Sequence, residues 1–301
     1  MSRLRLLSAA GALVLVGSLA ACASPAQEPD DGIIHVVAST NVYGDIATTI
    51  GGKLVEVTSI IDDPAQDPHS FEADARVQLA LSKADVVIEN GGGYDDFVDT
   101  LLAGANNADA TVLNAADISG FNQKPAEGEF NEHVWYSFDA MGLLTDALVD
   151  ALSKAAPESA ATFKQNGADF HAGLDALTAR TDALAAQHAG VGVAYTEPVP
   201  GYLLAAAGLK NVTPDEFSEA IEEGTDVSPT VLAETIALFT SGTAELLVYN
   251  EQTTGPETEK VLTAATGAGV PVVPVTETLP AGSDYLGWMG SNVDAIQAAL
   301  S

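Results

Sequence analysis

The chain alternates between short, continuous apolar runs and longer segments in which apolar residues recur every three or four positions. Runs with the length and β-branched content of buried strands lie at residues 33–39, 54–61, 86–89, 191–195, 246–250 and 270–275. Helix-length segments lie between them at residues 42–50, 73–82, 94–103, 228–239 and 257–265. This alternation of strand and helix in both halves of the chain predicts βαβ units with mostly parallel sheets, and therefore an α/β fold.

Residues 157–189 interrupt the alternation, because nothing in this stretch has the pattern of a strand. A single apolar stripe at helical spacing runs through it: Phe163, Phe170, Leu174, Leu177 and Leu184. We therefore expect two lobes, each a mostly parallel sheet flanked by helices, joined by one long helix of roughly 50 Å. Gly167 and Gly173 weaken this helix. The predicted boundaries are an N-terminal lobe at 33–156, the linking helix at 157–190 and a C-terminal lobe at 191–301.

The first residues of the chain carry the pattern of a secretory signal peptide. Two arginines, Arg3 and Arg5, precede an apolar run that ends at Cys22, and the run is too short to be read as a membrane-spanning helix. The segment Leu19-Ala20-Ala21-Cys22 is similar to a bacterial lipobox, which predicts cleavage after residue 21 and lipidation of Cys22. The alternative is an ordinary signal peptide with an incidental cysteine. Breaker-rich residues 22–32 read as a flexible tether.

The charge balance limits the partners of this protein. It has 42 Asp and Glu residues against 11 Lys and Arg, a net charge of −31. Such a surface repels phosphate backbones and anionic lipid head groups, so we expect no nucleic-acid partner. Any attachment to a membrane should then depend on acyl chains at Cys22 and not on a basic patch.

Familiar enzyme motifs are missing from the sequence. The segment Gly91-Gly92-Gly93 follows a predicted strand, but Asp95 and Asp96 stand where a bound pyrophosphate would need space. The chain contains neither Gly-x-Ser-x-Gly nor His-Glu-x-x-His. We therefore expect a protein that is not an enzyme.

Two histidines and two glutamates occupy loops: His69, Glu197 and Glu277 follow predicted strands, and His133 leaves a Pro/Gly loop before a helical stretch. His69 and His133 lie in the N-terminal half, and Glu197 and Glu277 follow strands of the C-terminal half. Ligands bind at the carboxyl ends of strands in open α/β sheets, and imidazole with carboxylate suits a divalent transition metal. The wide spacing of the four residues excludes a local zinc-finger type of site. The remaining histidines favour structural or solvated positions: His35, His171 and His188.

Several segments resemble the zinc/manganese solute-binding lipoproteins of ABC transporters, often called cluster A-I or cluster 9. The most specific are Asp67-Pro68-His69-Ser70-Phe71-Glu72 and Asn131-Glu132-His133-Val134-Trp135. The similarity covers essentially the whole mature chain, including residues 37–40, 81–85 and 89–96.

The resemblance implies a function and a ligand set. Its architecture is two small α/β lobes joined by a rigid helix, and its metal ligands fall on His69, His133, Glu197 and Glu277. The fourth ligand of the family is usually aspartate, so Asp284 is the alternative to Glu277. The expected cargo is zinc or manganese, and the expected partners are an ABC permease and its ATPase. The resemblance also predicts a monomer on the outer side of the cell membrane.

Two other classes use the same ligand types. A lipid-anchored metallohydrolase would keep one coordination position open for water, with a base nearby. A metal-containing adhesin would use the ion only for structure. Whether four protein ligands close the site separates a carrier from a hydrolase, and growth on limiting metal separates uptake from adhesion.

Overall fold

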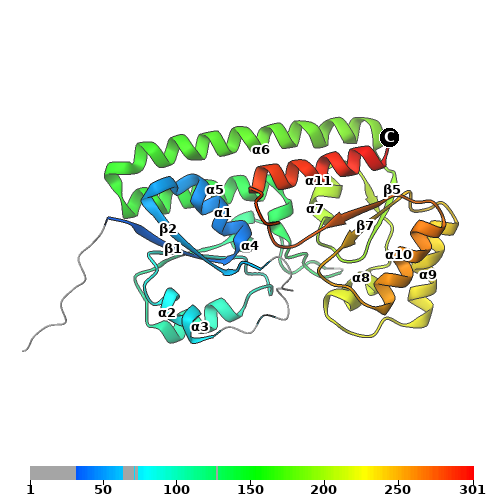
Figure 1. Cartoon of the computed structure of the whole chain (residues 1–301), viewed down its shortest axis with the longest axis horizontal. Helices are drawn as coiled ribbons and strands as arrows, with labels where there is room; N and C mark the ends of the chain where they lie inside the picture. The colour runs from blue at the N-terminus through cyan, green and yellow to red at the C-terminus, as the bar shows by residue number, and fades with distance from the viewer. Residues whose placement is uncertain (1–31, 64–70, 72–73, 127) are drawn as a thin grey trace, which may run out of the picture. The chain divides into compact units, whose positions relative to one another are not determined.

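Two parallel four-stranded sheets form the framework of a computed structural model that describes residues 32–63, 71, 74–126 and 128–301 (Figure 1). The first has the order β2-β1-β3-β4 and the second the order β6-β5-β7-β8. All pairings are parallel, with Val36 opposite Val86 in one sheet and Val193 opposite Leu246 in the other. The strands are β1 (Ile34–Thr40), β2 (Val55–Ile61), β3 (Val86–Glu89), β4 (Thr111–Asn114), β5 (Gly192–Tyr195), β6 (Lys210–Asn211), β7 (Leu246–Asn250) and β8 (Val272–Val275).

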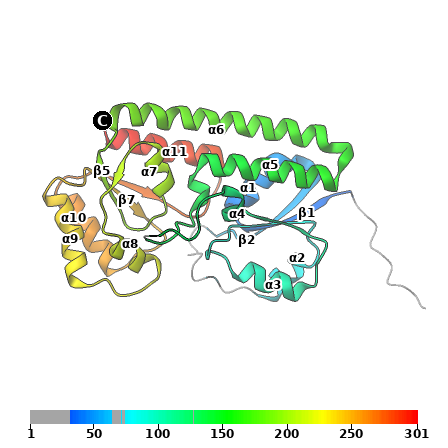
Figure 2. The same ribbon diagram turned by 180° about the vertical axis from the view of Figure 1, so that it is seen from behind.

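The helices cover both faces of each sheet, as expected for an α/β fold (Figures 1 and 2). Their bounds are α1 (Asn41–Gly51), α2 (Ala75–Leu81), α3 (Phe97–Ala105), α4 (Ala115–Ser119), α5 (Phe138–Ala155), α6 (Ala160–His188), α7 (Gly201–Ala206), α8 (Asp215–Glu222), α9 (Pro229–Thr240), α10 (Pro256–Gly267) and α11 (Tyr285–Ala299). The predicted fold class is therefore confirmed. The strands β4 and β6, which the apolar pattern did not predict, are short and lie at sheet edges.

The long helix α6 continues through both of its glycines. A Cβ atom at Gly167 would lie 2.6 Å from Val149 Cγ2 of α5, and one at Gly173 would overlap Leu286 of α11. The glycines therefore allow neighbouring helices to approach closely, and this packing offsets their low helix propensity. In both views α11 lies alongside α6 (Figures 1 and 2), and α6 also contacts α1 and α5 of the first lobe and α7 of the second.

Alternation along the strands divides the apolar core into three parts. In β1, Val36 and Ala38 face the α6 side, whereas Val37 faces α2 and α3. In β7, Val248 faces the α6 side, whereas Tyr249 faces α9 and α10. The part beneath α6 is continuous from the first sheet to the second, while each lobe has a separate outer part. The stretch from residue 33 to residue 301 accordingly forms one compact unit.

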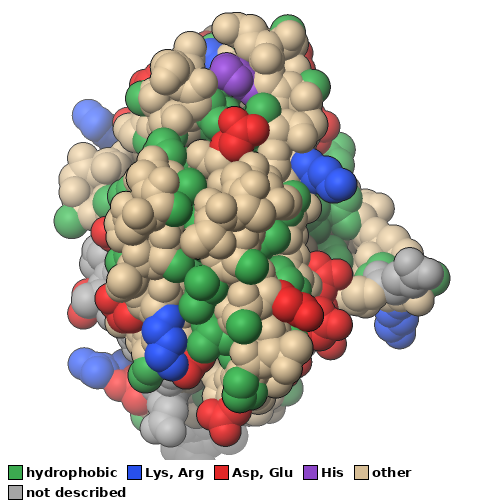
Figure 3. Space-filling model, turned by 90° about the vertical axis from the view of Figure 1, so that its right-hand side faces the viewer, with side chains coloured by type: hydrophobic (Ala, Val, Ile, Leu, Met, Phe, Trp, Pro, Cys, Tyr) green, Lys and Arg blue, Asp and Glu red, His purple; other side chains and the backbone are tan. Residues whose placement is uncertain are grey.

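The surface of the second lobe reflects the acidity of the sequence. Acidic side chains are spread over the face shown in Figure 3, and the lysine and arginine side chains there lie apart from one another. Among the described residues, this face therefore presents no positively charged cluster. In the part of the chain that the structure describes, no helix combines the length and apolar character needed to cross a membrane.

Candidate metal centre

His133 is held in place by a residue that follows β3, one of the two central strands of the first sheet. Its side chain is fully buried, and it directly precedes the short 3-10 turn at Val134–Tyr136. Asn90, just beyond β3, donates from its side chain to Glu132 O at 2.9 Å and accepts a hydrogen bond from the Tyr43 hydroxyl. The backbone that carries His133 is therefore fixed by a buried amide.

Asn131 orients the imidazole of His133. Its Nδ2 donates to Pro198 O at 2.9 Å, so its Oδ1 is the atom that lies 2.8 Å from His133 Nδ1. An amide oxygen can only accept a hydrogen bond, so His133 Nδ1 carries a proton. In the neutral ring the lone pair then lies on Nε2, which is the atom left to bind a metal. Because Pro198 belongs to the second lobe, the same amide also joins the two lobes.

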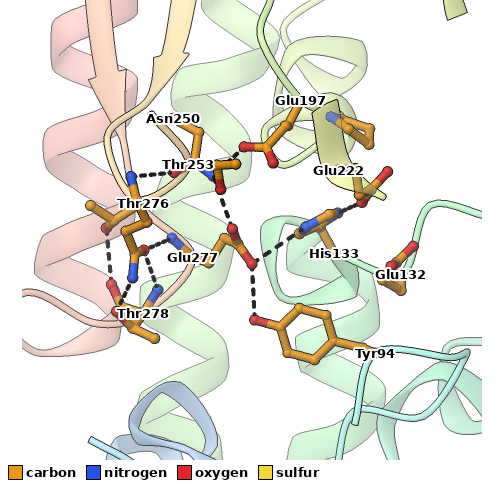
Figure 4. Close-up of polar contacts among 12 residues, drawn as sticks. Tyr94, Glu132, His133, Glu197, Glu222, Asn250, Thr253, Thr276, Glu277 and Thr278 are labelled. Carbon is orange, nitrogen blue, oxygen red and sulfur yellow. Dashed lines mark hydrogen bonds and ion pairs between the residues drawn. The ribbon is translucent and has the colours of Figure 1, made fainter. Parts of the chain in front are cut away.

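Glu197 and Glu277 extend from two loops of the second lobe, after β5 and β8, and their exposed fractions are 2% and 0%. Asn250, the last residue of β7, lies between them. Its Nδ2 donates to Glu197 Oε2 and, at 2.9 Å, to Glu277 Oε1 (Figure 4). Two buried carboxylates repel one another when both are charged, and a shared amide donor reduces this cost.

The loop that carries Glu277 is attached to both lobes. Gln252 accepts a hydrogen bond from the backbone N–H of Glu277, and the Tyr94 hydroxyl of the first lobe donates to Glu277 Oε2 at 3.1 Å. Two residues further on, Leu279 pairs with the side chain of Asn41 in α1, through bonds of 2.8 and 2.9 Å. The position of Glu277 relative to the first lobe is therefore well defined.

The donor atoms suit one small divalent cation. His133 Nε2 and Glu277 Oε2 are 3.8 Å apart, and two ligands of one tetrahedral zinc ion must lie roughly 3.4 Å apart. Glu197 Oε1 is buried and has no hydrogen-bond partner among the described residues. A buried carboxylate oxygen without a partner is costly, and a bound cation would satisfy it.

The close charges change the pKa of two of these groups. Burial, together with the neighbouring Glu277 carboxylate, raises the pKa of Glu197 to about 8. Burial alone would lower the pKa of His133, but the neighbouring carboxylates of Glu277, Glu222 and Glu132 outweigh burial and raise it. Both groups therefore keep protons at a pH where the same groups in water would release them.

Further carboxylates lie on the other edge of the His133 ring. Glu132, His133 and Glu222 each offer one ligand atom, and these atoms lie within 4.8 Å of one another. Glu222 Oε1 is 3.6 Å from His133 Nδ1, the atom that also bonds to Asn131. The imidazole is therefore surrounded by negative charge on both edges, which favours the approach of a cation.

The structure brings together three of the four predicted ligands: His133, Glu197 and Glu277. His69 lies outside the described residues. Asp284, the alternative to Glu277, is exposed, and its side chain caps α11 by accepting from Gly287 N at 2.7 Å.

The other histidines lie away from this cluster. His171 is partly exposed and is 2.9 Å from Asp146, and His188 lies partly exposed in the last turn of α6. His35 is partly exposed on β1, 3.9 Å from Glu56. These positions agree with the structural or solvated roles expected for them.

Sequence reasoning missed the residues that position the carboxylates. Asn250 ends a buried strand and Gln252 follows it, so the same rule about strand ends that applies to Glu197 and Glu277 could have found them. Tyr94 appeared only as the first residue of the predicted helix at 94–103 and within the family-like segment at 89–96. Glu222 ends the acidic helix α8, and its sequence context resembles that of any exposed glutamate.

Similar sequences include metal-binding lipoproteins. The chain is 32% identical over 149 residues to the manganese-binding lipoprotein MntA of Bacillus subtilis, which covers 49% of this chain and 48% of MntA. It is 24% identical over 306 residues to the zinc-binding lipoprotein AdcA of Streptococcus pneumoniae, which covers 93% of this chain and 58% of AdcA. The matches therefore span about half to three fifths of the length of these relatives.

Solved structures share the fold. The periplasmic zinc binding protein TroA from Treponema pallidum has a TM-score of 0.75 and 21% identity, covering 90% of this chain and 100% of TroA. A crystal structure of ZnuA has a TM-score of 0.74 and 18% identity, covering 89% of this chain and 100% of that one. The family model described as ZnuA, zinc-uptake complex component A, periplasmic, matches residues 36–299. This match confirms the resemblance seen in the sequence, and the protein belongs to the ZnuA family.

Proposed function

We propose that this protein captures one divalent transition-metal ion, zinc or manganese, between its two lobes and delivers it to an ABC uptake transporter. The proposed ligands are His69, His133, Glu197 and Glu277. The observation that carries the proposal is a buried imidazole nitrogen of one lobe facing two buried carboxylates of the other. The relative scaA of Streptococcus gordonii, 27% identical over 56% of each chain, is a manganese ABC transporter substrate-binding lipoprotein.

Burial favours a carrier over a metallohydrolase. A hydrolase needs a position open to water and substrate, whereas His133 and Glu277 are fully buried and Glu197 is nearly so. Four protein ligands would enclose the ion. We therefore assign no catalytic role to these residues.

Delivery requires attachment at the outer side of the cell membrane, next to the permease and its ATPase. We propose that Cys22, which lies outside the described residues, carries the lipid anchor, and that the tether at 22–32 allows the folded part to reach the permease. Substitution Cys22→Ala should then release the protein from membranes without changing metal binding.

A pair of variants tests the function and the fourth ligand together. Protein purified without added metal should take up one Zn(II) or one Mn(II) ion per chain, counted by native mass spectrometry. Glu277→Ala should weaken binding by about a hundredfold or more, because one of four ligands is lost. Asp284→Ala, the matched control, should keep its affinity and lose only about 1 kcal/mol of stability with the helix cap. Loss of affinity in Asp284→Ala alone would show that the fourth ligand is wrongly assigned.

A further inference from the structure

We propose that Asn131 is a positioning residue that couples contact between the two lobes to metal binding, because the second lobe holds the amide that in turn holds the imidazole of His133. This inference rests on the proposed function, since it concerns how the same site keeps and releases its ion. The coupling runs between two of the proposed ligands, His133 of the first lobe and Glu197 of the second.

The amide of Asn131 can take only one orientation. Its Oδ1 lies 3.0 Å from the backbone nitrogen of His133, which can only donate, and its Nδ2 lies 2.9 Å from the carbonyl oxygen of Pro198, which can only accept. The same Oδ1 lies 2.8 Å from His133 Nδ1, which must therefore donate to it. Glu222 Oε1 is also near Nδ1 but, at 3.6 Å, lies beyond hydrogen-bonding range.

Three residues of the second lobe contact Asn131, and all belong to the segment that directly follows Glu197. Pro198 accepts from the side chain of Asn131, and the Tyr202 hydroxyl donates to its backbone carbonyl at 2.7 Å. Gly201 lies so close that a Cβ atom there would be 2.7 Å from Asn131 Nδ2. A small displacement of this segment would therefore reach the amide directly.

A chain of hydrogen bonds thus leads from the imidazole to Asn131, and from Asn131 to Pro198 of the second lobe. A cation on Nε2 of His133 withdraws electron density from the ring and makes Nδ1–H a stronger donor, and polarisation passes along such chains. Metal binding should therefore strengthen the contact between the lobes. Because such coupling is reciprocal, loss of that contact should weaken metal binding, so separation of the lobes would help to release the ion.

Substitutions in the second lobe test the coupling without changing a proposed ligand. Gly201→Ala suits helix α7 but places a methyl group against Asn131 Nδ2, and Tyr202→Phe removes the hydroxyl that donates to Asn131 O. Each disturbs a hydrogen bond that contributes about 1 kcal/mol, so Zn(II) should dissociate about fivefold faster than from wild type. The rate is measured by transfer of Zn(II) from the loaded protein to an excess of a coloured chelator.

The Nδ1–H proton of His133 gives a second, local readout. In Zn(II)-loaded wild type it should exchange slowly with water, because it is buried and bonded to Asn131, and proton NMR of 15N-labelled protein measures that exchange. Gly201→Ala and Tyr202→Phe should make the exchange faster. Asn131→Ala removes the acceptor, so it should give the fastest exchange and release Zn(II) about tenfold faster or more.

Matched controls make the same changes where Asn131 is not involved. Tyr249→Phe removes a hydroxyl that bonds to Glu259 within the second lobe. Gly267→Ala adds a methyl group to α10, where it meets no other described residue within 4 Å. Both controls should release Zn(II) at the wild-type rate and leave the exchange of the His133 proton unchanged.

The outcomes separate this inference from the proposed function. A wild-type protein that binds no Zn(II) would overturn the function and the coupling together. Normal Zn(II) binding, with wild-type release and exchange in Gly201→Ala and Tyr202→Phe, would overturn the coupling alone. Equal acceleration in the two controls, or faster release without faster Nδ1–H exchange, would also overturn it, because the lobes would then act on the ion by another route.

Discussion

In both lobes the buried carboxylates accept hydrogen bonds from their own lobe, but those of the second lobe also face the first lobe. Glu89 accepts from Asn114, and Asp95 accepts from the backbone N–H groups of Asn90 and Gly91 at 2.6 and 2.7 Å. The two sheets have the same strand order, so topology alone does not separate the roles. The difference depends on where the residues after each strand direct their oxygen atoms.

A second contrast concerns the asparagine at the end of β3 in the first sheet and of β7 in the second, two central strands. Asn90, after β3, holds the Glu132 carbonyl and so fixes the backbone that carries His133. Asn250, ending β7, instead holds the carboxylate side chains of its lobe. One lobe therefore positions its ligand through the main chain, and the other through side chains.

The largest effect should come from the imidazole that faces both carboxylates. His133→Ala removes a ligand from a fully buried site, so metal affinity should fall by about a hundredfold or more. His171→Ala, also on the first-lobe side of α6 but paired with Asp146, should bind as wild type does. Calorimetric titration of both variants measures this difference. Wild-type affinity in His133→Ala would mean that the first lobe supplies its ligands elsewhere.

An intermediate effect is expected from pH, through Glu197. Its pKa is raised to about 8 from 4.5, so the folded protein keeps a proton that the unfolded chain releases. Without metal, stability should therefore fall as pH rises from about 5 to about 8, while metal affinity should rise over the same range as the proton becomes easier to displace.

Glu197→Gln should flatten the fall in stability, measured by denaturant unfolding in a chelator between pH 5 and pH 8. Glu158→Gln removes a charge at an exposed position and serves as the control. Equal slopes in wild type and Glu197→Gln would argue that the Glu197 carboxyl is already ionised in the folded state.

The smallest effect on metal binding should follow substitution of Glu89, a buried carboxylate of the first lobe. Glu89→Gln keeps an oxygen that can accept from Asn114, so metal affinity should stay within about twofold of wild type. Burial raises the pKa of Glu89 to about 7, so its ionisation costs stability at higher pH. The variant should lose less stability than wild type between pH 5 and pH 8. A large change in metal affinity would show that Glu89 contributes to the metal site, contrary to the contrast drawn between the two lobes.

Much of the fold could be predicted because its central strands are buried on both faces. Continuous apolar runs identify β1, β3 and β7 without tertiary information. The edge strands β4 and β6 have short, partly exposed sequences, and their pairing depends on neighbours far along the chain. Helix α6 was predicted from its apolar stripe, although only packing against α5 and α11 explains why its glycines are tolerated.

The sequence could predict those parts of the site whose residue types are themselves typical metal ligands. Glu197 and Glu277 stand at strand ends, and these two residues and His133 match a family pattern, so sequence could bring them forward as candidates. The role of Asn250 could not be predicted, because an amide gains importance only from the atoms it meets. Those atoms belong to loops 53 and 27 residues away in sequence.

The core under α6 runs without a break from one sheet to the other. Unfolding of either lobe alone would therefore expose apolar surface of the other lobe to water. Heating should therefore unfold residues 33–301 in one cooperative transition. An ion at a hundred times its Kd would add about 2.7 kcal/mol to the stability of both lobes at once. Under the proposed function, cells short of metal would then hold a protein that is cut more readily by proteases along residues 33–301, so metal supply would influence how much of it survives. Limited proteolysis with and without Zn(II) would reveal such protection.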